Sequence, residues 1–516
     1  MIGIFFEKNL KKIKFLFVIF LFVCLIIQLF LIEDSNNIPG LLYLLISNLL
    51  IFFYCLNANN IRNFTISTFS ILYICFHTNC SAIFLKSIFW EPVDENLFNS
   101  NFTLFFLLIS NLIIILIHIL YKNITFFQKL VKYFQKIFFY FNIDQAYEKN
   151  FLFFIGLVSL VSAFIFYVFF NELIYDNSYT EPKLIGDLLN GTNIFFICPM
   201  IVLFTSKIYN YHLTKKDFFI ILISIIFIFF ISLGLNNRSA FFDILFTGIL
   251  IYVLLILTGI IEIKVLRFNK IFIILLFGIL VANTIDRFSY TYIDVRDIRD
   301  KTNPVLYIKN HFNIFLANET KNKNKDQSNR IFKEDYYKIS ILNRINIVKN
   351  TDNVLYANLF LNSVQKNDLL DYELGQIISI APQPIINIFS STFNKSVFLQ
   401  KSITSKIYKS VDKYFVGGKS SGSLFPILYV YNNYLYLSVF IFFVLISFSV
   451  LDSLKYDNRY LIILFIFLYS TSGGLINFIS TGSTAKLVSI LVRTLPQSII
   501  IFALLNFIYK KFKNKT

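Results

Sequence analysis

Residues 217–235 have the sequence DFFIILISIIFIFFISLGL, in which the only charged side chain is Asp217 at the beginning. A helix of roughly 20 residues is needed to cross a hydrocarbon core about 30 Å thick. Within that core the backbone must satisfy its own hydrogen bonds, and a long unbroken apolar stretch does so only as a helix. The stretch therefore predicts a membrane-spanning helix.

Apolar stretches of this length recur along the chain. Hydrophobic residues make up 56% of the 516 residues and charged residues 15%, whereas about a quarter of a soluble domain is charged. The sequence lacks the short alternating strands of a transmembrane barrel. We therefore expect an all-α polytopic membrane protein with about 12 transmembrane helices. The expected spans are 15–32, 41–57, 65–85, 103–120, 151–170, 187–206, 217–235, 240–261, 270–285, 424–450, 461–480 and 486–509.

The distribution of positive charge predicts the orientation. If the N-terminus is cytoplasmic, 22 Lys and Arg residues fall in the cytoplasmic segments and four in the short outer loops. Lys and Arg are retained in cytoplasmic loops, so this bias favours that orientation. An even number of spans then places the C-terminus in the cytoplasm as well. The net charge of +17 is explained by topology, and no nucleic-acid partner is expected.

One segment between spans nine and ten is far longer than a turn. Residues 286–423 carry 20 Lys and Arg and 13 Asp and Glu, with few apolar runs. Loops beyond about 15 residues are usually functional or disordered. We expect residues 1–285 to form spans one to nine, 286–423 a large extracytoplasmic loop, and 424–516 spans ten to twelve with a cytoplasmic tail. Short helices are expected near 303–317, 334–348 and 354–364.

A second extramembrane piece, residues 124–143, has the pattern of an amphipathic helix. Lys129, Lys132 and Lys136 share one helical face, with apolar residues nearby. Such a helix lies on a membrane surface and is attracted by anionic lipid. Anchoring to membrane lipids is favoured over a role in coupling.

Two arginines occupy positions that a membrane protein seldom uses. Arg238 directly follows the span quoted above, at the outer surface, and its planar fork suits phosphate. Alternatively, it snorkels to lipid phosphates or caps a helix end. Arg493 lies inside the last expected span, seven residues after Lys486 and so about 10 Å further along a helix. An intramembrane Arg is costly and marks a functional site by default; the alternative is a buried pair with Asp243 or Asp187.

Two further cations belong to the large loop. Arg344 sits in an apolar segment, and Lys419 lies in the Gly- and Ser-rich stretch 417–423. Gly-rich backbone with Lys and Ser can wrap an anion, although this stretch lacks the Walker spacing and is equally suited to a hinge. The four histidines and five cysteines show no metal-ligand spacing. Neither a metal site nor a cofactor is expected.

The architecture and two local patterns resemble the bacterial O-antigen or oligosaccharide-repeat-unit polymerases (Wzy-type). One pattern is an Arg-Ser pair at the outer end of a span, here Arg238-Ser239, followed by a long hydrophobic helix. The other is a Gly/Ser-rich approach to the helix after the large loop, here residues 417–426. The family often has a further Gly pair near the start of that helix, where this chain has Asn432-Asn433-Tyr434.

The resemblance implies a GT-C-like integral membrane glycosyltransferase of the bacterial cytoplasmic membrane, acting in O-antigen, lipopolysaccharide or capsule biosynthesis. It would transfer a growing glycan from one undecaprenyl diphosphate to another lipid-linked repeat unit, without a nucleotide sugar. Its partners would be undecaprenyl-diphosphate-linked oligosaccharides, with a chain-length regulator as a further partner that the resemblance allows.

This chemistry needs positive charge for the lipid diphosphate that leaves and a base for the acceptor hydroxyl. The expected diphosphate-binding residues are Arg238, Arg493, Arg344 and Lys419, and we expect Arg238 and Arg493 to share one cavity. The candidate bases are His311, Asp286 and Glu373.

Two other functions remain open. An O-antigen ligase, or another lipid-linked-sugar glycosyltransferase, has the same layout and differs in its acceptor. A lipid-linked oligosaccharide flippase also has about 12 spans, but transporters usually show two repeated halves and short outer loops. The long loop therefore argues against a flippase.

Overall fold

The computed structural model describes most of the chain. It covers residues 3–143, 147–169, 191–209, 212–234, 238–263, 346–390, 392–399, 401–412, 423–454, 461–470 and 482–514, with short pieces at 309, 313–314, 331–332, 335–338, 342–343, 415 and 475–476. Every regular element within these ranges is a helix, as the composition predicts. The all-helical prediction is therefore confirmed for the described residues.

The helices fall into three groups along the chain. Those before residue 264 are α1 (Phe6–Leu31), η1 (Ser35–Asn37), α2 (Ile38–Cys55), α3 (Ala58–Asn63), α4 (Thr65–Cys75), η2 (Phe76–Cys80), α5 (Ser81–Ile88), α6 (Ser100–Asn123), α7 (Thr125–Tyr140), α8 (Lys149–Phe169), η3 (Asn193–Ile197), α11 (Cys198–Tyr209), α12 (Lys215–Gly234) and α13 (Arg238–Leu257). Those of the large loop are α16 (Val348–Asn358), α17 (Ser363–Ile378), α18 (Gln383–Phe389), α19 (Lys395–Leu399) and α20 (Ile403–Val411). The last group is α21 (Leu424–Tyr431), α22 (Tyr434–Ser453), α23 (Leu461–Ser470), α24 (Thr484–Ser489), η7 (Ile490–Thr494) and α25 (Leu495–Lys513).

Six helical stretches in the described ranges are long and apolar enough to cross a membrane. They are Phe6–Leu31, Ser35–Cys55, Thr65–Ile88, Ser100–Asn123, Tyr434–Ser453 and Thr484–Lys513. They correspond to expected spans one to four, ten and twelve, and they identify a helical membrane protein. The total of about 12 spans stays a prediction, and expected span nine, 270–285, lies outside the described residues.

Expected span ten is interrupted. The sequence predicts one helix over 424–450, but α21 ends at Tyr431, with Asn432 as its C-cap, and α22 begins at Tyr434. Asn432 has φ 49°, in the left-handed region that Asn tolerates better than most residues. The side chain of Asn433 then accepts the N–H of Tyr436 and caps the new helix. The candidate membrane crossing is therefore α22 alone, Tyr434–Ser453.

Expected span three contains polar residues because it packs inside the bundle. In the most apolar 18 residues of its stretch Thr65–Ile88, 78% are buried, a larger share than in any other candidate span of the described part. The π-helical turn η2 within it carries Asn79, whose side-chain amide donates to Ser47 of α2. At the beginning of α4 the backbone N–H groups of Ile66 and Ser67 donate to Asp452 of α22, at 3.1 and 3.0 Å. Polar contacts between helices thus hold this stretch in place.

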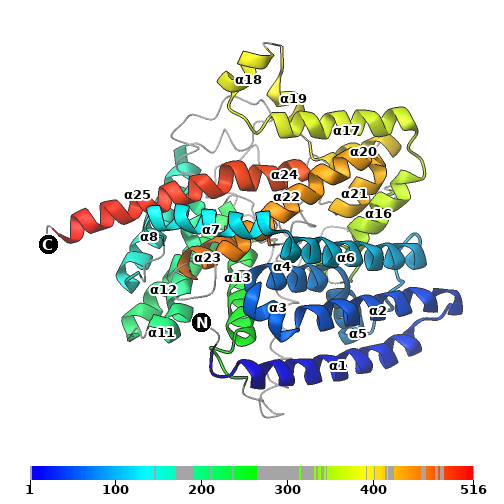
Figure 1. The fold of residues 1–516 in the computed structure, drawn as a ribbon, viewed down its shortest axis with the longest axis horizontal. Coiled ribbons are helices and arrows are strands. Elements are labelled where there is room, and N and C mark those ends of the chain that lie inside the picture. Colours follow the sequence, from blue (N-terminus) through cyan, green and yellow to red (C-terminus); the bar gives the residue numbers. More distant parts are fainter. Residues whose placement is uncertain are drawn as a thin grey trace.

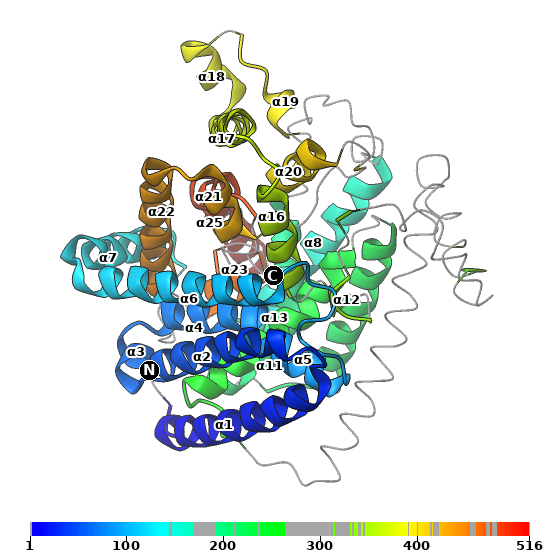
Figure 2. The same ribbon diagram turned by 90° about the vertical axis from the view of Figure 1, so that its right-hand side faces the viewer.

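The loop helices gather at one end of the molecule. In Figures 1 and 2, α17, α18, α19 and α20 lie together at the top, and both marked termini lie below them. Helices α1, α2 and α6 lie side by side in both views, and α2 packs against each of the other two.

Candidate functional site

The first attachment is a buried ion cluster around Lys86 near the end of α5. The ammonium lies 3.0 Å from Glu91 and 3.3 Å from Glu95, and Lys86 and Glu91 are both buried. The ring of Tyr336, from the large loop, lies 4.6 Å from the Lys86 Nζ atom, and that of Tyr337 5.7 Å. A cation paired with carboxylates and aromatic faces is stabilised without water. This cluster therefore fixes residues 336–337 to the first part of the chain.

The second attachment involves the π-turn η2. The N–H of Ile347 donates to the carbonyl of His77 at 3.2 Å, and the Asn346 amide donates to Ser81 Oγ at 2.6 Å. The His77 ring packs edge-on against Phe246 of α13, with centroids 5.6 Å apart. Phe246 lies eight residues after Arg238, about 12 Å along the helix. The loop therefore docks two turns from the end of α13 at which Arg238 lies.

The third attachment is Asp352 of α16, which is buried. Its carboxylate accepts the N–H of Phe98 at 2.9 Å and the hydroxyl of Thr103 at 3.0 Å. Lys349 neutralises it at 2.9 Å. Acceptors at a helix N-terminus satisfy free N–H groups and interact favourably with the helix dipole. Asp352 thus joins the loop to the beginning of α6.

The fourth attachment is Glu373 of α17, which is fully buried. Its carboxylate accepts the N–H of Thr484 at 2.5 Å and the hydroxyl of Tyr431. Burial raises the pKa of Glu373 above its ordinary value, although these hydrogen bonds act in the opposite direction. A carboxylate enclosed in this way fits an anchor better than a base that must reach a substrate. Glu373 joins α17 to α21 and to the N-terminus of α24.

Arg493 lies on the helix that Glu373 caps. It belongs to the π-helical turn η7, nine residues after Thr484, and its side chain is exposed. Asp187 and the side chain of Asp243 lie outside the described part of the structure, so the alternative of a pair with either of them is untested. π-Turns within α-helices are rare and occur frequently at functional sites. The predicted position of Arg493 in the last apolar helix thus has an unusual local structure.

The side chains of the other predicted diphosphate ligands, and two of the candidate bases, lie outside the described part of the structure. Arg238 is the first residue of α13, and its side chain lies outside the described part of the structure. The shared cavity with Arg493 therefore stays a prediction. Four more predicted residues lie outside the described ranges: Arg344, Lys419, His311 and Asp286.

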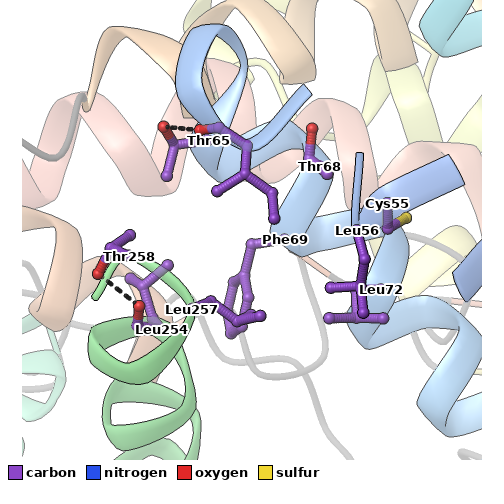
Figure 3. A pocket seen from close by; sticks show the side chains of 10 residues that line it. Cys55, Leu56, Thr65, Thr68, Phe69, Leu72, Leu254, Leu257 and Thr258 are labelled. Carbon is purple, nitrogen blue, oxygen red and sulfur yellow. Dashed lines mark hydrogen bonds between the residues drawn. The ribbon is translucent and has the colours of Figure 1, made fainter. Parts of the chain in front are cut away.

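The cavities found among the described residues do not fit a charged substrate. Figure 3 shows one of about 10 Å³ between α4 and α13, with Phe69 facing Leu254 and Leu257. At its edge the hydroxyl of Thr65 donates to the carbonyl of Ile61 in α3, and that of Thr258 to the carbonyl of Leu254 in α13. This volume holds about one water molecule at most.

A larger cavity of about 290 Å³ lies between α17, α18 and the segment that follows α18. Its lining is nearly all apolar and includes Ile378, Ile385, Phe389 and Phe393. No charged side chain lines it, so it is suited to hydrocarbon and not to a diphosphate.

Most of the anchoring residues carry no sign of their role in the local sequence. Lys86 is one of the four cations that the orientation count assigns to the short outer loops, and Glu91 and Glu95 follow it closely. Asn346 and Asp352 had no local signal, because their partners lie more than 200 residues away. His77 did have a signal, since a histidine in an apolar stretch is unusual.

The described fold is that of a helical membrane protein whose long loop segment is fastened to the bundle by buried polar contacts. Comparison with protein-family models, with curated proteins and with solved structures found no match.

Proposed function

We propose that this protein polymerises undecaprenyl-diphosphate-linked oligosaccharide repeat units at the outer face of a bacterial cytoplasmic membrane. The observation that best supports the proposal is the placement of Arg493. It is an exposed cation in a π-turn of the last apolar helix, and Glu373 ties the start of that helix to the loop. A substrate held between loop and membrane would therefore meet a fixed positive charge.

In the proposed reaction Arg493 and Arg238 bind the diphosphate of the donor lipid, with Arg344 and Lys419 as further ligands. The acceptor hydroxyl attacks the anomeric carbon, and the bond from that carbon to the phosphate oxygen breaks. The arginines stabilise the charge that develops on this oxygen, and the hydroxyl proton passes to a base. His311 and Asp286 remain the candidates for that base.

The decisive test is the length of surface glycans in cells that carry single substitutions. Arg493→Ala and Arg238→Ala are each expected to lower transfer by about 100-fold, the usual cost of losing one charge-stabilising group. Such cells should display single repeat units in place of long chains. Arg→Lys should restore activity only partly, because Lys keeps the charge and loses the bidentate fork.

Lys511→Ala is the matched control, since Lys511 is an exposed cation near the other end of the helix that continues from Arg493. It should leave glycan length unchanged. Long chains in both Arg→Ala strains would contradict the proposed site. Loss of every surface repeat unit would favour the flippase, and long chains that accumulate on the carrier lipid would favour the ligase.

The proposal also requires residues 286–423 to be extracytoplasmic. Cysteine introduced by Ser328→Cys should react with a membrane-impermeant thiol reagent in intact cells. The five native cysteines are all buried, so background labelling should be low. Labelling that appears only after lysis would refute this topology.

A further inference from the structure

We propose that α7 binds a bilayer surface containing anionic phospholipid through the face that it turns away from the protein. This inference is independent of the proposed transferase activity. It concerns the helix Thr125–Tyr140, which follows the candidate span Ser100–Asn123 after a single residue.

One face of α7 packs against the rest of the protein. Phe127, Val131 and Phe138 are buried. Ser449 of α22 donates to the Phe127 carbonyl at 3.4 Å, and the rings of Phe127 and Phe442 lie 6.5 Å apart. In Figure 2, α7 lies at the edge of the molecule beside α22. The apolar residues Phe127 and Val131 therefore belong to the face of α7 that packs against the protein.

The face of α7 that points away from the protein is both basic and aromatic. Lys129, Lys132 and Lys136 are exposed, and at 3.6 residues per turn they form a stripe opposite the buried residues. Aromatic side chains flank the stripe on both sides, with Tyr140 80% exposed and Phe139 64% exposed. The other two exposed aromatic residues are Phe126 and Tyr133.

The charge of this face selects the kind of surface it fits. α7 contains three lysines and no acidic residue. Lysines near a membrane are attracted by anionic headgroups, and exposed aromatic rings rest at the boundary between headgroups and hydrocarbon. Because α7 leaves a candidate span directly, it must lie close to that boundary. A soluble protein partner would account for the basic charge of this face, but not for the position of α7 directly after a candidate membrane-spanning helix.

The test uses the full chain in lipid nanodiscs, with Tyr140→Cys labelled by an environment-sensitive fluorophore. The native cysteines are buried and should not compete for the label. Discs contain phosphatidylcholine alone or phosphatidylcholine with phosphatidylglycerol. We expect the anionic lipid to shift the emission to the blue and to reduce quenching by aqueous iodide by about threefold or more, with the effect weakening at high salt.

Three variants identify the residues responsible. K129Q/K132Q/K136Q in the labelled chain should abolish the response to phosphatidylglycerol, and K129R/K132R/K136R should retain it. K510Q/K511Q/K513Q, an equal charge change at the end of α25, should also retain it. Equal quenching in both kinds of disc would overturn the proposal and is what a second copy or a protein partner on this face would give. A full response in the Lys→Gln variant would overturn it as well.

Discussion

Replacing Lys86 by methionine is expected to destabilise the protein by about 3–5 kcal/mol, the usual cost of removing one partner from a buried ion pair. The lysine is fully buried, and its removal leaves the buried carboxylate of Glu91 without a compensating charge. It also removes the cation that lies against Tyr336 of the loop. Thermal unfolding followed with a thiol-reactive dye measures this, because all five cysteines are buried in the folded chain.

Two further variants separate the charge effect from a general loss of packing. Lys338→Met removes an exposed lysine beside Tyr337, and its effect should stay within about 0.5 kcal/mol. Lys86→Met combined with Glu91→Gln should regain part of the lost stability, because no unpaired charge is then buried. A double variant as unstable as the sum of the two single variants would contradict the role assigned to the pair.

Glu373→Gln is expected to destabilise the protein by about 2–3 kcal/mol. The carboxylate accepts hydrogen bonds from the Thr484 N–H and the Tyr431 hydroxyl, and an amide NH₂ group cannot accept. A buried donor left unsatisfied costs about 1–3 kcal/mol. Asp371→Asn is the matched control, an exposed carboxylate two residues earlier on α17, and should have little effect.

The raised pKa of Glu373 also predicts how the effect of Glu373→Gln on stability depends on pH. Burial raises the pKa of Glu373 in the folded chain above its ordinary value. The stability that this shift contributes is therefore fully present below the ordinary pKa and is lost as pH rises through the raised pKa. The difference in melting temperature between the wild type and Glu373→Gln should shrink over the pH interval above the ordinary pKa of a glutamate, about 4.3. A difference that grows over this interval would contradict the direction of the shift.

Composition predicted the helical membrane architecture because a long apolar stretch has few alternatives inside a bilayer. It did not predict the break in 424–450. Only Asn432 and Asn433 mark the break in the sequence, and an asparagine in an apolar stretch is also compatible with a continuous helix. In the loop, the helix expected near 334–348 was wrong in position: residues 346–347 are not helical, and α16 begins at Val348.

The candidate site was predictable only where a single residue stands out. Arg493 was found because a charge in an apolar stretch is visible without knowledge of its neighbours. The π-turn around it leaves no mark in composition, since it changes only which carbonyl each N–H group meets. The partners of Asn346, Asp352 and Glu373 are set by tertiary packing and were not accessible from local patterns.

The π-turn η7 also affects how insertions and deletions would act on the last helix. In a regular helix Lys486 and Arg493, seven residues apart, would lie nearly on one face, since each residue turns the helix by about 100°. A π-turn accommodates one extra residue. Arg493 is therefore rotated by about 100° away from the helix face on which Lys486 lies. Deleting one residue between Ser489 and Leu495 would leave a continuous α-helix of almost the same length and composition. The residues after the deletion would keep their directions relative to α24, because the π-turn already absorbs the extra residue, whereas the same deletion in a regular part of the helix would rotate them by about 100°.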